Sequence, residues 1–149
     1  MLTQKIKVLI ADDHIIFRRG LKMLLASIDG IELVGEAENG LDLLAVAARY
    51  TPDVFLVDIS MPVMDGVMAT KELCKRHPGA KVIALSVFGQ ESHIMEMLDA
   101  GALGYLMKNA DKADIEQAIE SVFNNRSYFC TESNKQVKDL IDKFQSGSK

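Results

Sequence analysis

The chain has 149 residues, which is enough for one domain with a full hydrophobic core. Apolar residues account for 48% and charged residues for 26%, as in ordinary soluble globular proteins, and no apolar run approaches the ~20 residues of a membrane span. The net charge of −4 argues against a basic surface for nucleic acid on the domain as a whole.

Short apolar runs alternate with longer segments of helical period along the whole chain. In the first half, we expect a strand at 7–11, a helix at 14–28, an edge strand at 31–37 and a helix at 41–49. In the second half, we expect a strand at 54–57, a helix at 66–75, a strand at 82–85, a helix at 91–100, a strand at 104–107 and a helix at 112–125. This alternation is typical of βα units around a parallel sheet.

Five strands in strict alternation with five helices predict an α/β fold with a doubly wound, flavodoxin-like parallel sheet. Right-handed crossovers between parallel strands favour such a doubly wound sheet. The strand order 2-1-3-4-5 is inferred from this type of fold. The first strand then lies beside the third, at the point where the order reverses. Open α/β sheets bind their ligands in the crevice at that point.

A charged or polar residue follows four of the five apolar runs. Asp12-Asp13, Asp58, Ser86 and Lys108 would therefore meet at the carboxyl edge of the sheet. Carboxylates ~4 Å apart repel by roughly 4 kcal/mol at an effective dielectric near 20, so a cation is expected among them. Oxygen ligands suit Mg²⁺, and a lysine and a hydroxyl suit a phosphoryl group. Asp58 is the best candidate nucleophile, with Asp12 and Asp13 as metal ligands.

The remaining polar features are less informative. The histidines at 14, 77 and 93 show no ligand spacing, so we expect surface positions for them. Cys74 and Cys130 match no metal-binding spacing, and the apolar run after the N-terminal lysines is too short for a signal peptide. We therefore expect a cytoplasmic protein with reduced thiols.

The C-terminal segment differs from the rest of the chain. Thr131 is a candidate cap for a further helix, and its apolar positions follow helical spacing: Val137, Leu140, Ile141 and Phe144. Such a helix either docks on its own domain or serves as a linker or dimerisation helix, and the sequence favours neither. We therefore divide the chain into a domain at 1–130 and a helix or linker at 131–149.

The motifs at the strand ends resemble those of a known family. The chain resembles the receiver domain of bacterial two-component response regulators over about residues 5 to 125, and it is most similar to the NarL/LuxR-type branch. The matching segments are 8–14 (Val-Leu-Ile-Ala-Asp-Asp-His), 57–66 (Val-Asp-Ile-Ser-Met-Pro-Val-Met-Asp-Gly), 84–86 (Ala-Leu-Ser) and 101–108 (Gly-Ala-Leu-Gly-Tyr-Leu-Met-Lys).

The resemblance implies a role for each site residue. Asp58 would accept a phosphoryl group from a histidine kinase or phosphotransfer protein, and Lys108 would pair with that group. Ser86 would move toward the phosphoryl group while Tyr105 turns inward. The ligands of Mg²⁺ would be Asp12, Asp13, Asp58 and the backbone carbonyl of Ser60.

The resemblance also implies a signalling switch rather than an enzyme with an external substrate. Such a switch catalyses only its own phosphorylation and dephosphorylation. The resemblance allows a homodimer that forms on phosphorylation, and it implies contact with DNA only through a helix-turn-helix effector domain that is not part of these 149 residues. The 19 residues after Cys130 are too few for that domain. No membrane partner is expected.

Three other functions fit the sequence less well. A phosphatase with an aspartyl nucleophile needs a second acid two residues later, where this chain has Ser60. A flavin-binding domain needs a phosphate-binding loop after the first strand, and Asp12-Asp13 there would repel a phosphate. A receiver-like domain that is never phosphorylated would not need the complete set of acids.

Two positions depart from the family pattern. Asn109 follows Lys108 where many members have proline, which leaves the isomer of the 108–109 bond open. Val87 follows Ser86 where a smaller residue is usual, and its bulk would narrow access to Asp58.

We therefore expect phosphorylated wild-type protein to lose its phosphoryl group more slowly than a Val87→Ala variant, because water reaches Asp58 less easily past the valine. The measurement is the rate of dephosphorylation of the two purified proteins. Equal rates would contradict the expectation.

Overall fold

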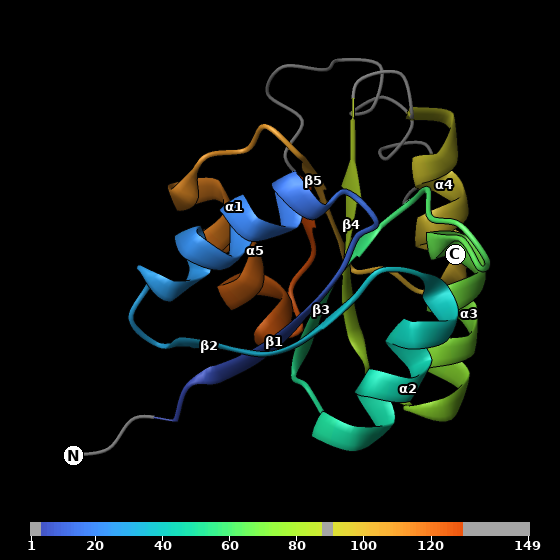
Figure 1. Cartoon of the computed structure of the whole chain (residues 1–149), viewed down its shortest axis with the longest axis horizontal. Coiled ribbons are helices and arrows are strands. Elements are labelled where there is room, and N and C mark those ends of the chain that lie inside the picture. The colour runs from blue at the N-terminus through green and yellow to red at the C-terminus, as the bar shows by residue number, and fades with distance from the viewer. Residues whose placement is uncertain (1–3, 88–90, 130–149) are drawn as a thin grey trace.

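The computed structural model describes residues 4–87 and 91–129. The strands are β1 (Ile6–Ala11), β2 (Ile31–Ala37), β3 (Val54–Asp58), β4 (Lys81–Ser86), β5 (Gly104–Met107) and β6 (Tyr128–Phe129). The helices are α1 (Ile15–Ala26), α2 (Gly40–Tyr50), α3 (Gly66–Arg76), α4 (Glu91–Ala100) and α5 (Lys112–Phe123). The strands form one parallel sheet in the order β2-β1-β3-β4-β5-β6, which confirms the flavodoxin-like fold and the order predicted for the first five (Figure 1).

The sheet is one strand wider than predicted. Tyr128 and Phe129 pair with Gly104 and Tyr105 at the edge of the sheet and add β6. A two-residue strand has no periodicity that the sequence could reveal, so it was missed. The helix expected after Thr131 lies outside the described residues.

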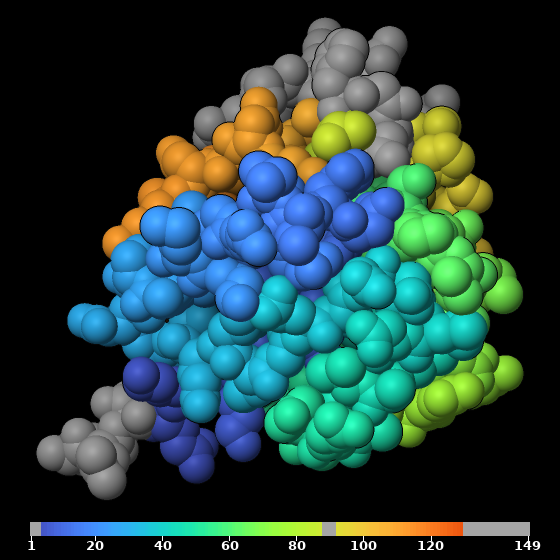
Figure 2. Space-filling model, in the orientation of Figure 1, coloured from blue at the N-terminus to red at the C-terminus, as the bar shows by residue number. Residues whose placement is uncertain are grey.

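The helices cover both faces of the sheet. One side carries α1 and α5, and the other carries α2, α3 and α4 (Figure 1). The segments α1, β2 and α2 form much of the surface in the space-filling view, and the start of β1 is visible at the lower left (Figure 2). No helix among the described residues is long and apolar enough to cross a membrane.

Each face of the sheet has its own apolar core. Alternating strand residues divide between the two: Phe55 and Val57 pack toward α2, α3 and α4, while Val54 and Leu56 pack toward α1 and α5. All five residues of β3 are buried, as expected for a central parallel strand with helices on both faces. The last of them is Asp58, so a carboxylate is buried at the edge of the core where β3 ends.

The loop after β3 is held tightly against that strand. The Gly66 N–H donates to the Ile59 carbonyl at 2.8 Å, and Asp65 caps α3 by accepting from the Met68 N–H at 2.9 Å. A Cβ at position 66 would lie 2.9 Å from Ile59 Cα and would collide with the Asp58 carbonyl oxygen. A glycine is therefore required where α3 begins.

We expect Gly66→Ala to lower the free energy of unfolding by about 2 kcal/mol or more, because the colliding atoms belong to the backbone and cannot turn away. The matched control is Gly20→Ala in α1, where a Cβ meets no atom within 4 Å. That change should stabilise the helix by about 0.5–1 kcal/mol. Urea denaturation of both variants measures the difference, and equal effects would contradict the packing argument.

Candidate functional site

Three strand ends bring opposite charges together at the carboxyl edge of the sheet. Asp12 follows β1, Asp58 ends β3 and Lys108 follows β5. Lys108 Nζ lies 2.7 Å from Asp12 Oδ2 and 3.1 Å from Asp58 Oδ2. Asp12 and Asp58 are 0% and 1% exposed, so this ammonium lies between two buried carboxylates. The predicted meeting of these residues is confirmed.

Backbone contacts fix the position of each carboxylate. The His14 N–H donates to Asp12 Oδ1 at 2.8 Å, and the Ser60 N–H donates to Asp58 Oδ1 at 3.3 Å. Arg18 of α1 donates to the backbone carbonyl of Asp12 and pairs through Nε with Glu36 of β2 at 2.9 Å. Arg18 was not predicted, because nothing in its local spacing shows that it reaches back to Asp12.

Lys108 is held by two further contacts. Its backbone N–H donates to the Ser86 carbonyl at 2.8 Å, which ties the end of β5 to β4. Its ammonium lies 4.8 Å from the centre of the Phe17 ring, a cation–π contact from α1. The bond between Lys108 and Asn109 is trans.

The groups around Asp58 have opposite effects on its pKa. Burial raises the pKa of Asp58, the nearby Asp12 charge raises it further, and Lys108 and the Ser60 N–H lower it, so that it stands at about 6 instead of 3.8. Asp12 Oδ2 forms the ion pair with Lys108 but accepts no hydrogen bond from the described residues. Ion-pairing with one lysine leaves this buried pair of carboxylates with an excess of negative charge.

The excess charge lies where a cation could bind. One ligand atom each from Asp12, Asp13, His14 and Asp58 lies within 4.8 Å of the others. The Asp13 side chain is 32% exposed, so the group opens to solvent on its side. His14 was expected at the surface, and its side chain is 62% exposed, yet its Nδ1 also reaches this group. Its place directly after Asp12-Asp13 was the signal in the sequence that could have found it.

Ser86 ends β4, whose neighbours in the sheet are β3 and β5, and Tyr105 of β5 lies in the core on the α4 side of the sheet. Both are buried, at 1% and 0% exposed. The Tyr105 hydroxyl donates to Met107 Sδ at 2.7 Å, and Ser86 Oγ lies 3.6 Å from the same sulfur. The tyrosine is therefore already turned inward in this structure. Met107 was not predicted at the site; the pairing of Ser86 with Met107 in the sheet brings it there.

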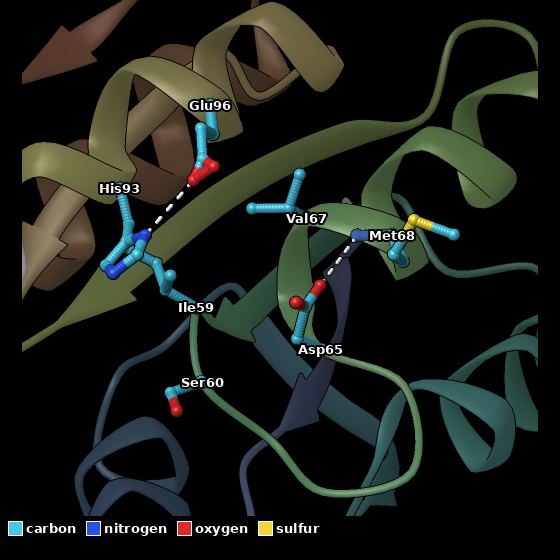
Figure 3. Close-up of a pocket in the computed structure, with 7 residues that line it drawn as sticks. All are labelled: Ile59, Ser60, Asp65, Val67, Met68, His93 and Glu96. Carbon is cyan, nitrogen blue, oxygen red and sulfur yellow. Dashed lines mark hydrogen bonds and ion pairs between the residues drawn. The ribbon is translucent and has the colours of Figure 1, made fainter.

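An open pocket of about 440 Å³ adjoins the site between the loop after β3 and α4 (Figure 3). Its lining residues are Ile59, Ser60, Asp65, Val67, Met68, His93 and Glu96. His93 Nδ1 pairs with Glu96 at 3.1 Å, and both side chains are 54% exposed, in keeping with the surface position expected for His93. Ser60 is thus exposed to a solvent-filled space rather than enclosed in the core.

Comparisons with known proteins agree with this geometry. The family model described as response regulator receiver domain matches residues 8–120. Response regulator GacA of Pseudomonas syringae pv. syringae (strain B728a) is 39% identical over 132 residues, which cover 89% of this chain and 62% of GacA. Transcriptional regulatory protein DegU of Brevibacillus brevis is 40% identical over 124 residues, which cover 83% of this chain and 52% of DegU.

A solved structure is similar over most of its length. The REC domain of AraT, a response regulator from Geobacillus stearothermophilus, is 34% identical with a TM-score of 0.72, covering 80% of this chain and 93% of that domain. The chain therefore spans nearly all of an isolated domain of this kind. It spans between half and two thirds of the length of GacA and DegU.

The raised pKa of Asp58 predicts a pH-dependent stability in the absence of metal ions. The folded state holds a proton on Asp58 more tightly than the unfolded state does, so stability falls as the pH rises from about 4 to about 6. Above that range, the ionised carboxylate of Asp58 lowers the free energy of unfolding by about 3 kcal/mol. We expect Asp58→Asn to raise the free energy of unfolding by up to that amount at pH 7.5 in EDTA, and by much less at pH 4.

Urea denaturation at the two pH values measures this gain. Asp29→Asn is the control, because Asp29 is exposed in the turn before β2 and its change should give no gain that depends on pH. A gain of equal size at both pH values, or a loss at pH 7.5, would show that burial of the ionised Asp58 is not costly.

Proposed function

The chain belongs to the response regulator receiver domain family, and from this premise we propose that it is a phosphorylation-dependent switch whose phosphoacceptor is Asp58. The observation that carries the proposal is the position of Lys108, 3.1 Å from Asp58 and 2.7 Å from Asp12. A cation that bridges two buried carboxylates is placed to receive further negative charge. Phosphoryl transfer depends mainly on such positioning and charge neutralisation.

The proposed reaction is a direct displacement at phosphorus. A carboxylate oxygen of Asp58 attacks the phosphorus of a phosphohistidine on a histidine kinase or phosphotransfer protein. The P–N bond breaks, its electron pair stays on the imidazole, and an aspartyl phosphate forms. Lys108 pairs with the phosphoryl oxygens and so offsets the charge that arrives.

The residues around Asp58 fit Mg²⁺. The donors are carboxylate and carbonyl oxygens, which Mg²⁺ prefers, and the two buried carboxylates of Asp12 and Asp58 share one lysine. We assign Asp12, Asp13, Asp58 and the backbone carbonyl of Ser60 as the protein ligands. When bound, Mg²⁺ would offset the negative charge of the carboxylates and of the phosphoryl group.

Ser86 and Tyr105 are the proposed switch residues. Ser86 would leave Met107 and donate its hydroxyl to the phosphoryl group. Tyr105 is already buried in the apolar core that includes Ile94 and Met97 of α4, so phosphorylation would favour a conformation that the unmodified protein also visits. The phosphoryl group shifts the equilibrium by contacts that only the active conformation makes.

The activity of the longer protein is part of the proposal. Because GacA and DegU extend well beyond the matched region, we infer an effector domain that binds DNA and regulates transcription in the full-length protein. Residues 131–149 would form the connecting helix or linker. The receiver would form a homodimer on phosphorylation, and it would hydrolyse its own aspartyl phosphate with water as the nucleophile.

The test is intact-mass measurement after incubation with Mg²⁺ and a small acyl phosphate. We expect one phosphoryl adduct on the wild type, because Asp58 is the buried nucleophile beside Lys108. Asp58→Asn should show none, and the control Asp29→Asn should keep the adduct. A wild type that stays unmodified under conditions that label other receivers would contradict the proposal.

A further inference from the structure

We propose that Arg18 of α1 is a positioning residue for the cation site, because it holds the peptide group that joins Asp12 to Asp13. The inference rests on the proposed function, since it concerns the residues assigned to Mg²⁺ beside Asp58. In this role Arg18 contacts neither the cation nor the phosphoryl group. It acts through the backbone of the segment that carries two of the ligands.

The backbone of Asp12 is fixed on both sides. Its N–H donates to the Ala37 carbonyl at the end of β2 at 3.0 Å, and its carbonyl accepts a hydrogen bond from Arg18 Nη1. Its side chain accepts from the His14 N–H at 2.8 Å. The carbonyl of Asp12 and the N–H of Asp13 belong to one planar peptide group, so a bond to the carbonyl orients the whole group. The directions of the Asp12 and Asp13 side chains therefore depend on Arg18.

The burial of Asp12 makes this contact hard to replace. Asp12 is fully buried, so water does not readily take the place of the guanidinium as the donor to its carbonyl. A buried carbonyl that loses its partner is unfavourable. Without Arg18, we expect the peptide group to turn in search of another donor, and this would move both acidic side chains.

Glu36 of β2 holds the guanidinium in place. Arg18 Nε donates to Glu36 Oε1 at 2.9 Å while Nη1 reaches the loop after β1. One rigid planar group thus makes both contacts at once, which a lysine could not do. Burial raises the pKa of Glu36, but Lys22 and Arg18 lower it by more, so that it lies below its ordinary value of 4.5. Glu36 is therefore ionised at neutral pH and pairs with Arg18, whose side chain is only 13% exposed.

A positioning role can be separated from an effect of charge, because the two predict opposite changes in Mg²⁺ affinity. Removal of a positive charge near a cation site strengthens cation binding. Loss of a contact that orients the ligands weakens it. Contacts behind metal ligands are typically worth about 10–100-fold in affinity, and a contact through the backbone belongs at the lower end, so we expect Arg18→Gln to weaken Mg²⁺ binding about tenfold.

Two further variants complete the comparison. Arg18→Lys keeps the charge but not the double contact, so we expect it to weaken Mg²⁺ binding as well. The matched control is Lys22→Gln, one turn further along α1. Lys22 Nζ pairs with the same Glu36 at 2.7 Å, and among the described residues it forms no hydrogen bond or ion pair with Asp12. Its loss removes the same charge, and because Lys22 is partly exposed the affinity should change by less than about twofold.

Two measurements on the whole chain test the inference. Calorimetric titration with Mg²⁺ gives the affinity of each variant. Hydrogen exchange of the His14 amide, measured in EDTA, reports the position of Asp12 without any metal ion, because this N–H donates to Asp12 Oδ1. If Arg18→Gln fails to fold, Arg18→Lys, which keeps the length and charge of the side chain, provides the test.

The expected result is weaker Mg²⁺ binding and faster exchange at His14 in both Arg18 variants, with Lys22→Gln close to the wild type. Mg²⁺ binding as tight as in the wild type in either Arg18 variant, or an equal loss in Lys22→Gln, overturns the inference and leaves the proposed function intact. The expected pattern of affinities in a protein whose wild type forms no phosphoryl adduct supports the inference and contradicts the proposed function.

Discussion

The structure depends on one ion-pair arrangement, in which a single ammonium lies between two buried carboxylates. Burial and the charge of Asp12 raise the pKa of Asp58, and Lys108 offsets part of that effect. Three strands, the loop after β3 and the first turn of α1 all contribute to holding these groups in place. The fold thus maintains an electrostatic imbalance that a bound cation or a protonation event relieves.

The fold could be predicted because its signals lie in contiguous segments. Apolar runs such as Val54–Asp58 identify strands, and their alternation with helices indicates a doubly wound sheet. The strand order was inferred from that fold type and not from the residues themselves. The meeting of Asp12, Asp58 and Lys108 then follows from topology alone, since parallel strands end at one edge. β6 gave no signal because two residues show no period, and it forms only where β5 already offers a partner.

The finer parts of the site depend on side-chain directions that no spacing specifies. We expected His14 at the surface because the histidines show no ligand spacing. Its side chain is indeed exposed, yet its ring turns toward three carboxylates. Arg18 acts on the backbone of Asp12 rather than on a charged group, a contact that charge patterns do not predict. Met107 reaches Ser86 and Tyr105 through strand pairing, so its neighbours become evident only once the register is known.

The close approach of Gly66 to the carbonyl of Asp58 has a consequence for how such a domain can change over time. At Gly66, the first residue of α3, there is room for a hydrogen atom but not for a Cβ, because the carbonyl of Asp58 at the end of β3 lies there. A side chain at position 66 would therefore collide with the backbone of Asp58, although the two residues lie eight positions apart in the sequence. Homologous chains can therefore vary the exposed residues of α3, but the glycine at its first position must be kept for as long as the backbone of Asp58 stays where it is.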